Sequence, residues 1–125
     1  MRWALFHPPL WLLRLGLVTV LVWGWITAVS PSAGGGDWFP HSDKFKHALA
    51  FAAFSVWIWA VRLQPRWLWA TLLLAYGIGI EWAQSQVPSR QASLADVLAD
   101  AAGIALGFAA CWLIERRLRS PVAAP

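Results

Sequence analysis

The chain has 125 residues, of which 59% are hydrophobic and 13% are charged, whereas a soluble domain has about 45–50% and about 25%. This composition excludes a surface covered by water, and the 11 tryptophans are typical of membrane–water interfaces. The formal net charge is +4, but the basic residues lie at the ends of apolar runs and form no continuous stripe, so we expect no nucleic-acid partner.

Four apolar stretches follow one another along the chain, each close to the ~20 residues that cross a bilayer as a helix. They are Pro9–Val29, Lys44–Leu63, Arg66–Gln86 and Ser93–Ile114. The charge-free parts of the last three are shorter, and by length alone they also fit buried core helices. Because the four stretches leave no polar shell to cover them, we predict an all-α bundle of four transmembrane helices in a single domain, residues 1–125.

Helix-breaking residues separate the stretches. Gly34–Gly36 lies in the longest connection, Pro65 ends the second stretch and Pro88 ends the third. Ser93 is a natural N-cap for the fourth stretch, and Asp96 follows three residues later, which resembles a capping box.

The distribution of Lys and Arg predicts that both termini lie in the cytoplasm. With the N-terminus inside, the inner side carries Arg2, Arg14, Arg62, Arg66, Arg116, Arg117 and Arg119, and the outer side carries only Lys44, Lys46 and Arg90. This bias agrees with the positive-inside rule. A cleaved signal peptide is the alternative for the first stretch, although the residues after it offer only a poor cleavage site.

The acidic residues gather on the predicted outer side. Ionisable groups within membrane segments usually face the bundle interior and have partners, so we expect a polar cluster of Asp43, His47, Glu81, Arg90, Asp96 and Asp100, with the first helix more peripheral. Asp37 belongs to the same side, whereas Glu115 lies inside.

Helical spacing supports this cluster. Asp43, Lys44 and His47 share a surface, as do Glu81 and Gln84. A single stripe of the last helix carries two carboxylates and two glycines that would let another helix approach closely, namely Asp96, Asp100, Gly103 and Gly107.

Each of these features also has a purely structural interpretation. Asp43 would serve as an N-cap, Lys44 and Lys46 would anchor in the headgroup layer, and the glycines would only pack. Asp96 and Asp100 would form a boundary ion pair with Arg90 or Lys44. A lone Cys111 in an apolar run is a packing residue.

Together these residues form a pattern that resembles the VanZ-like family of small bacterial integral membrane proteins. The pattern is Asp43-Lys44-x-x-His47-x-x-x-Phe51, Glu81-x-x-Gln84, Pro88-Ser89-Arg90 and Ser93-x-x-Asp96-x-x-x-Asp100-x-x-Gly103-x-x-x-Gly107. It covers about residues 43–107, and it departs from the family where Asp100 replaces a common Asn. The resemblance implies a multi-pass protein of the bacterial inner (cytoplasmic) membrane. The family's founding member is linked to resistance to the glycopeptide teicoplanin.

Two functions fit the pattern. In the first, the outer polar site binds a lipid or a lipid-linked envelope component without catalysis, through Asp43, Lys44, His47, Glu81, Gln84, Arg90, Asp96 and Asp100. In the second, the protein is a membrane-embedded hydrolase or transferase acting on a lipid-linked phosphate, with His47, Glu81 and Asp96 as catalytic candidates. The sequence names no dedicated metal site and no cofactor, although the enzyme hypothesis would allow a divalent cation on His47, Glu81, Asp96 and Asp100.

Overall fold

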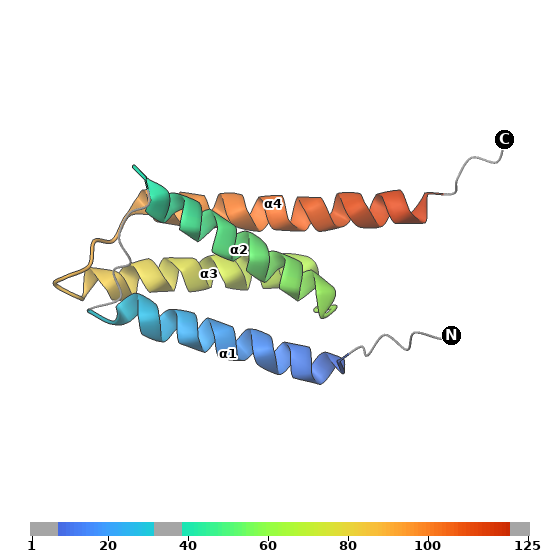
Figure 1. The fold of residues 1–125 in the computed structure, drawn as a ribbon, viewed down its shortest axis with the longest axis horizontal. Helices are drawn as coiled ribbons and strands as arrows, with labels where there is room; N and C mark the ends of the chain where they lie inside the picture. The colour runs from blue at the N-terminus through green and yellow to red at the C-terminus, as the bar shows by residue number, and fades with distance from the viewer. Residues whose placement is uncertain (1–7, 32–38, 121–125) are drawn as a thin grey trace.

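The computed structural model describes residues 8–31 and 39–120, which form four α-helices and contain no strand. Helix α1 spans Leu10–Val29, α2 spans Ser42–Ala60, α3 spans Arg66–Ser85 and α4 spans Leu94–Arg119. The helices run alternately up and down, so α1 begins and α4 ends at the same end of the bundle (Figure 1). Arg2, Gly34–Gly36 and Asp37, which entered the sequence predictions, lie outside the described residues.

Helix α2 ends three residues before the predicted Leu63. The chain closes it with a Schellman motif, in which the N–H of Leu63 donates to the Ile58 carbonyl and the N–H of Arg62 donates to the Trp59 carbonyl. Arg62 takes the left-handed conformation that this motif needs, with φ 57°. Local hydrogen bonding therefore ends α2 before Pro65 is reached. Helix α4 is longer than predicted and continues past Ile114 to Arg119.

Helices α2 and α4 form the closest pair in the bundle. Gly103 and Gly107 lie on α4 directly against the α2 backbone, because a Cβ at Gly107 would lie 2.7 Å from the Ala52 carbonyl oxygen and one at Gly103 would overlap the backbone of Ala48. The predicted close approach at these glycines is confirmed, and α2 is the helix that approaches.

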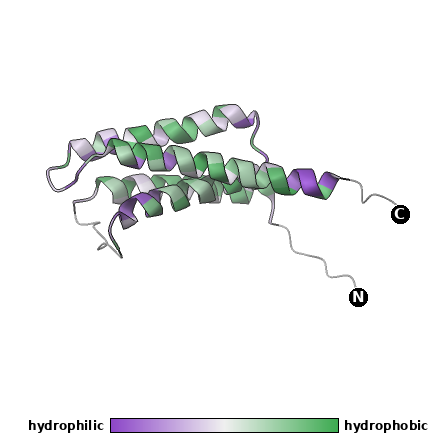
Figure 2. Ribbon diagram, turned by 90° about the horizontal axis from the view of Figure 1, so that it is seen from above, coloured by the Kyte–Doolittle hydropathy of each residue, from purple (hydrophilic) through white to green (hydrophobic). Residues whose placement is uncertain are grey.

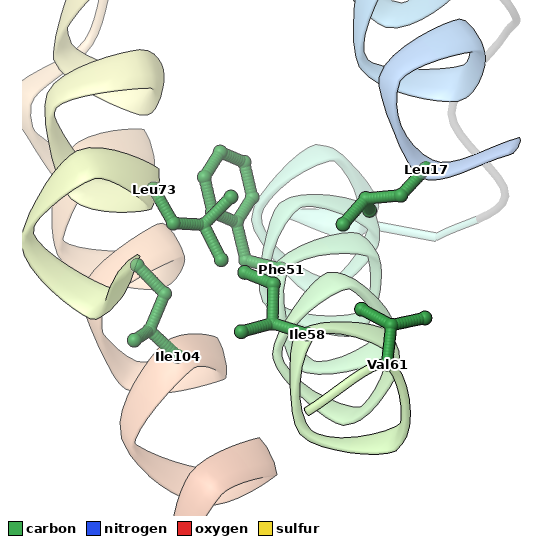
Figure 3. Packing of buried hydrophobic residues seen from close by; sticks show 6 residues of the cluster. All are labelled: Leu17, Phe51, Ile58, Val61, Leu73 and Ile104. Atoms are coloured by element: carbon green, nitrogen blue, oxygen red, sulfur yellow. The ribbon is translucent and has the colours of Figure 1, made fainter. Parts of the chain in front are cut away.

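All four helices contribute to a small apolar core (Figure 3). It contains Leu17 from α1, Phe51 and Ile58 from α2, Val61 at the C-cap of α2, Leu73 from α3 and Ile104 from α4. These side chains are at most 7% exposed. Phe51, the last residue of the first family-like motif, is therefore a core residue.

Helix α1 is the peripheral member, with Leu17 as its one buried residue. Polar side chains of α2 and α3 bind its backbone: Trp57 Nε1 donates to the Leu13 carbonyl at 3.1 Å, and the Tyr76 hydroxyl donates to the Leu21 carbonyl at 2.6 Å. Such bonds fix α1 against its neighbours although it buries little side-chain surface.

Hydrophobic residues predominate along the middle of the helices, and hydrophilic residues gather towards their ends (Figure 2). Two helices, α1 and α4, are long and apolar enough to cross a membrane. Large apolar side chains are exposed on α2 and α3 as well, among them Leu49, Val56, Leu72 and Ile78.

Candidate functional site

One end of the bundle brings together the first turns of α2, the last turns of α3 and the first turns of α4 (Figure 1). This arrangement places three polar sequence motifs side by side. Their carboxylates are deeply buried: Glu81 and Asp96 are each 6% exposed and Asp100 is fully buried. We call His47, Glu81, Asp96 and Asp100 the polar site.

His47 and Asp100 form the innermost contact of the polar site. Nδ1 of His47 lies 2.8 Å from Oδ1 of Asp100 and joins α2 to α4. The carboxylate fixes the orientation of the imidazole ring and takes up one ring nitrogen, so Nε2 is the nitrogen that remains for another partner.

Glu81 reaches across from α3 to the start of α4. Its Oε2 accepts a hydrogen bond of 2.8 Å from the backbone N–H of Ser93. The expected capping box is therefore wrong: the Ser93 side chain makes no capping hydrogen bond, and Glu81 takes the N–H that Asp96 was expected to bind. Asp96 is free to face the polar site because another helix supplies the capping carboxylate.

Lys44 links the polar site to its rim. Its Nζ lies 3.1 Å from Oδ2 of Asp43 and 3.4 Å from Oδ1 of Asp96, and the second contact is an ion pair without hydrogen-bond geometry. Helix α2 begins at Ser42, so Asp43 lies in its first turn and is not the N-cap. The ion pair predicted between Asp96 and Lys44 is confirmed.

Arg90 is not part of the polar site. Its guanidinium binds the end of α1, with Nη2 donating to the carbonyls of Thr27 at 3.1 Å and Ser30 at 2.8 Å. Among the described residues no ion pair joins Arg90 to Asp96 or Asp100, so the alternative in which Arg90 pairs with these carboxylates is wrong. The last carbonyls of α1 have no following helical turn to bind them, and their partial negative charge attracts the cation.

Gln84 likewise faces α1, because its Nε2 donates to the Ala28 carbonyl at 3.1 Å. Gln84 and Arg90 thus fix the C-terminal end of α1, and the predicted ligand-binding residues divide into two groups. Asp43, Lys44, His47, Glu81, Asp96 and Asp100 meet around the polar site, whereas Gln84 and Arg90 support the neighbouring helix.

Three buried carboxylate oxygens of the polar site have no hydrogen-bond partner: Glu81 Oε1, Asp96 Oδ1 and Asp100 Oδ2. Buried polar atoms are normally satisfied, and exceptions call for a physical explanation. One potential metal-binding atom from each of His47, Glu81 and Asp96 lies within 4.8 Å of the others. The site therefore presents unused acceptors, and donor atoms of three of its residues lie close to one another.

Two further contributors to the polar site were not predicted from the residue pattern. Gly77 on α3 makes room for Asp100, because a Cβ there would lie 2.5 Å from Asp100 Oδ2. The backbone N–H of Ser93 holds Glu81. Gly77 lies four residues before Glu81 on the same face of α3, and this spacing is the one signal that could have identified it. The N–H of Ser93 is a backbone donor, which a pattern of residue types cannot reveal.

Comparison of the chain with models of protein families, with curated proteins and with solved structures yields no match.

Proposed function

We propose that the chain is a four-span protein of the bacterial cytoplasmic membrane with both termini inside. In the most apolar windows of α1 and α4 only 6% and 22% of residues are buried, whereas the core helix of a soluble protein is mostly buried. Helices α2 and α3, with 19 and 20 residues, run beside them and expose apolar side chains. Lipid is the solvent that accounts for this surface.

The charges at the two ends support the orientation. The end of the bundle opposite the polar site carries Arg66, Glu115 and Arg119, where Arg66 lies 3.8 Å from Glu115 and stacks on Trp59 at 3.5 Å. Arg116 and Arg117 add to the basic character of this end. The positive-inside rule assigns it to the cytoplasm and the polar site to the outer face.

We further propose that the polar site binds a phosphate-bearing lipid or a lipid-linked envelope precursor at the outer surface. The observation that carries this proposal is the burial of three carboxylates around His47. Buried charges rarely contribute net stability, and within membranes they usually mark a functional site. Lys44 supplies a donor for phosphate oxygens at its rim.

The contact between His47 and Asp100 favours a second candidate, a membrane-embedded hydrolase or transferase. An imidazole held by a carboxylate at 2.8 Å has the arrangement of a general base that abstracts a proton from water or a hydroxyl group. Release of inorganic phosphate or transfer of the headgroup by the purified protein would distinguish this candidate from binding alone.

Binding is tested with a polyprenyl phosphate and the matching polyprenol, each added to detergent-purified protein and followed by native mass spectrometry. We expect the phosphate to be retained and the alcohol to be lost. Lys44→Gln should weaken retention about 10–150-fold, since it removes one charge-assisted hydrogen bond worth roughly 1.5–3 kcal/mol. Arg116→Gln, at the opposite end, is the matched control and should bind as the wild type does. Equal retention of phosphate and alcohol would contradict the proposal.

A further inference from the structure

We propose that His47, Glu81 and Asp96 bind one divalent first-row metal ion, such as Mn²⁺ or Zn²⁺, and that Asp100 positions the histidine. The three side chains come from α2, α3 and α4, so the ion would join three helices at the centre of the polar site. The metal site stands on its own geometry; only its role in phosphate recognition rests on the proposed function.

The spacing of the donors suits an ion after a small contraction. The three potential ligand atoms lie within 4.8 Å of one another. Three ligands at about 2.0–2.2 Å from a tetrahedral metal ion are about 3.3–3.6 Å from one another. Closing the widest separation by up to about 1.5 Å is within the reach of side-chain rotation.

The donor set determines the class of ion. One imidazole nitrogen with two carboxylates combines the ligands preferred by Zn²⁺ and by Mn²⁺. Three protein ligands leave at least one coordination position open, as in catalytic metal sites. A phosphate oxygen would fit that position, and the metal would then lie between the phosphate and the carboxylates.

The carboxylate oxygens without a hydrogen bond point to a cation independently of the spacing. Glu81 and Asp96 are more than nine-tenths buried, and yet Glu81 Oε1 and Asp96 Oδ1 accept no hydrogen bond. Lys44 is the one described ammonium within 4 Å of these carboxylates, and it is shared with Asp43. A bound divalent ion would supply the missing positive charge, and Lys44 would keep its contact with Asp43.

The hydrogen bond between His47 and Asp100 completes the arrangement. Metal-binding histidines generally donate their second ring N–H to a carboxylate, which fixes the tautomer and makes the other nitrogen a better ligand. Nδ1 of His47 has such a partner in Asp100 at 2.8 Å, so Nε2 would bind the metal. Asp100 is thus a positioning residue.

The test uses the full chain in detergent, stripped with EDTA and titrated with Mn²⁺, while the electron paramagnetic resonance signal of free Mn²⁺ reports binding. We expect one Mn²⁺ per chain. Glu81→Gln and Asp96→Asn should each weaken affinity at least a hundredfold, and Asp100→Asn by about 10–100-fold. Spin-echo spectra should show nitrogen coupling to Mn²⁺ that His47→Gln abolishes.

Glu115→Gln, an acid at the opposite end of the bundle, is the matched control and should bind Mn²⁺ as the wild type does. Because the amide variants remove charge but keep shape, their melting temperatures in EDTA should equal or exceed that of the wild type. No saturable binding to the wild type, or undiminished binding to both Glu81→Gln and Asp96→Asn, would overturn the metal site. If EDTA leaves the retention of polyprenyl phosphate unchanged, the role of the ion in phosphate recognition is overturned. If the protein binds Mn²⁺ but does not retain the phosphate, the proposed function alone is overturned.

Discussion

Replacing Gly103 or Gly107 by alanine should separate α2 from α4. At Gly107 the added Cβ would lie 2.7 Å from the Ala52 carbonyl oxygen and 2.7 Å from the Cβ of Ser55. At Gly103 it would overlap the Ala48 backbone. The obstacles are mainly backbone and Cβ atoms, which cannot rotate away, so the helices themselves must move.

The size of the effect follows from the required movement. Carbon contacts are comfortable at about 3.5–4.0 Å, so α4 must shift by about 0.8 Å at Gly107. Overpacking of this kind costs about 1–3 kcal/mol, and the better helix propensity of alanine returns up to about 1 kcal/mol. We expect each substitution to lower the free energy of unfolding by about 1–2 kcal/mol. The shift also pulls Asp100 from His47, so Mn²⁺ affinity should fall.

Gly79→Ala on α3 is the matched control. A Cβ there would lie 3.3 Å from the ring of Trp25, a side chain that can adjust, so this substitution should be neutral or stabilising. The assay is unfolding of the purified protein in mixed detergent micelles, followed by tryptophan fluorescence. The packing argument is refuted if Gly103→Ala is as stable as Gly79→Ala.

Three further substitutions have defined outcomes. Arg90→Ala should lower the free energy of unfolding by roughly 1.5–3 kcal/mol, because it removes charge-assisted hydrogen bonds to the end of α1, and it should leave Mn²⁺ affinity unchanged. A fall in Mn²⁺ affinity without a loss of stability would show that Arg90 acts in the polar site. Tyr76→Phe removes the hydroxyl bond to the Leu21 carbonyl and should cost about 0.5–1.5 kcal/mol in the same unfolding assay, so an unchanged unfolding curve would show that this bond does not hold α1. Gly77→Ala should displace Asp100, whose Oδ2 would lie 2.5 Å from the new Cβ, and reduce Mn²⁺ affinity at least tenfold by the same titration; wild-type affinity would show that Asp100 does not need its present position.

The parts of the fold set by helical periodicity could be predicted from the sequence. The stripe of Asp96, Asp100, Gly103 and Gly107 is buried as expected, because one face of a long helix is defined by spacing alone. The meeting of α2, α3 and α4 at one end followed from the alternating direction of consecutive helices joined by short connections.

The predictions that failed depended on backbone hydrogen bonds, one set local and the others between distant segments. The end of α2 is set by Schellman hydrogen bonds around Arg62 before Pro65 acts. The capping carboxylate of α4 comes from Glu81 on another helix, and Arg90 binds carbonyls of α1 that lie 60 and 63 positions away in the chain. Spacing along one helix carries no information about a backbone acceptor on another.

Cysteine labelling in intact bacterial cells tests the central claim most directly, namely that the polar site opens at the outer face of a membrane-spanning bundle. In a Cys111→Ala background, Asp43→Cys and Arg119→Cys introduce single thiols at positions whose native side chains are 47% and 78% exposed. A membrane-impermeant maleimide should label Asp43→Cys in intact cells and Arg119→Cys only after the cells are opened. Labelling of Arg119→Cys in intact cells, with protection of Asp43→Cys until lysis, would contradict the account.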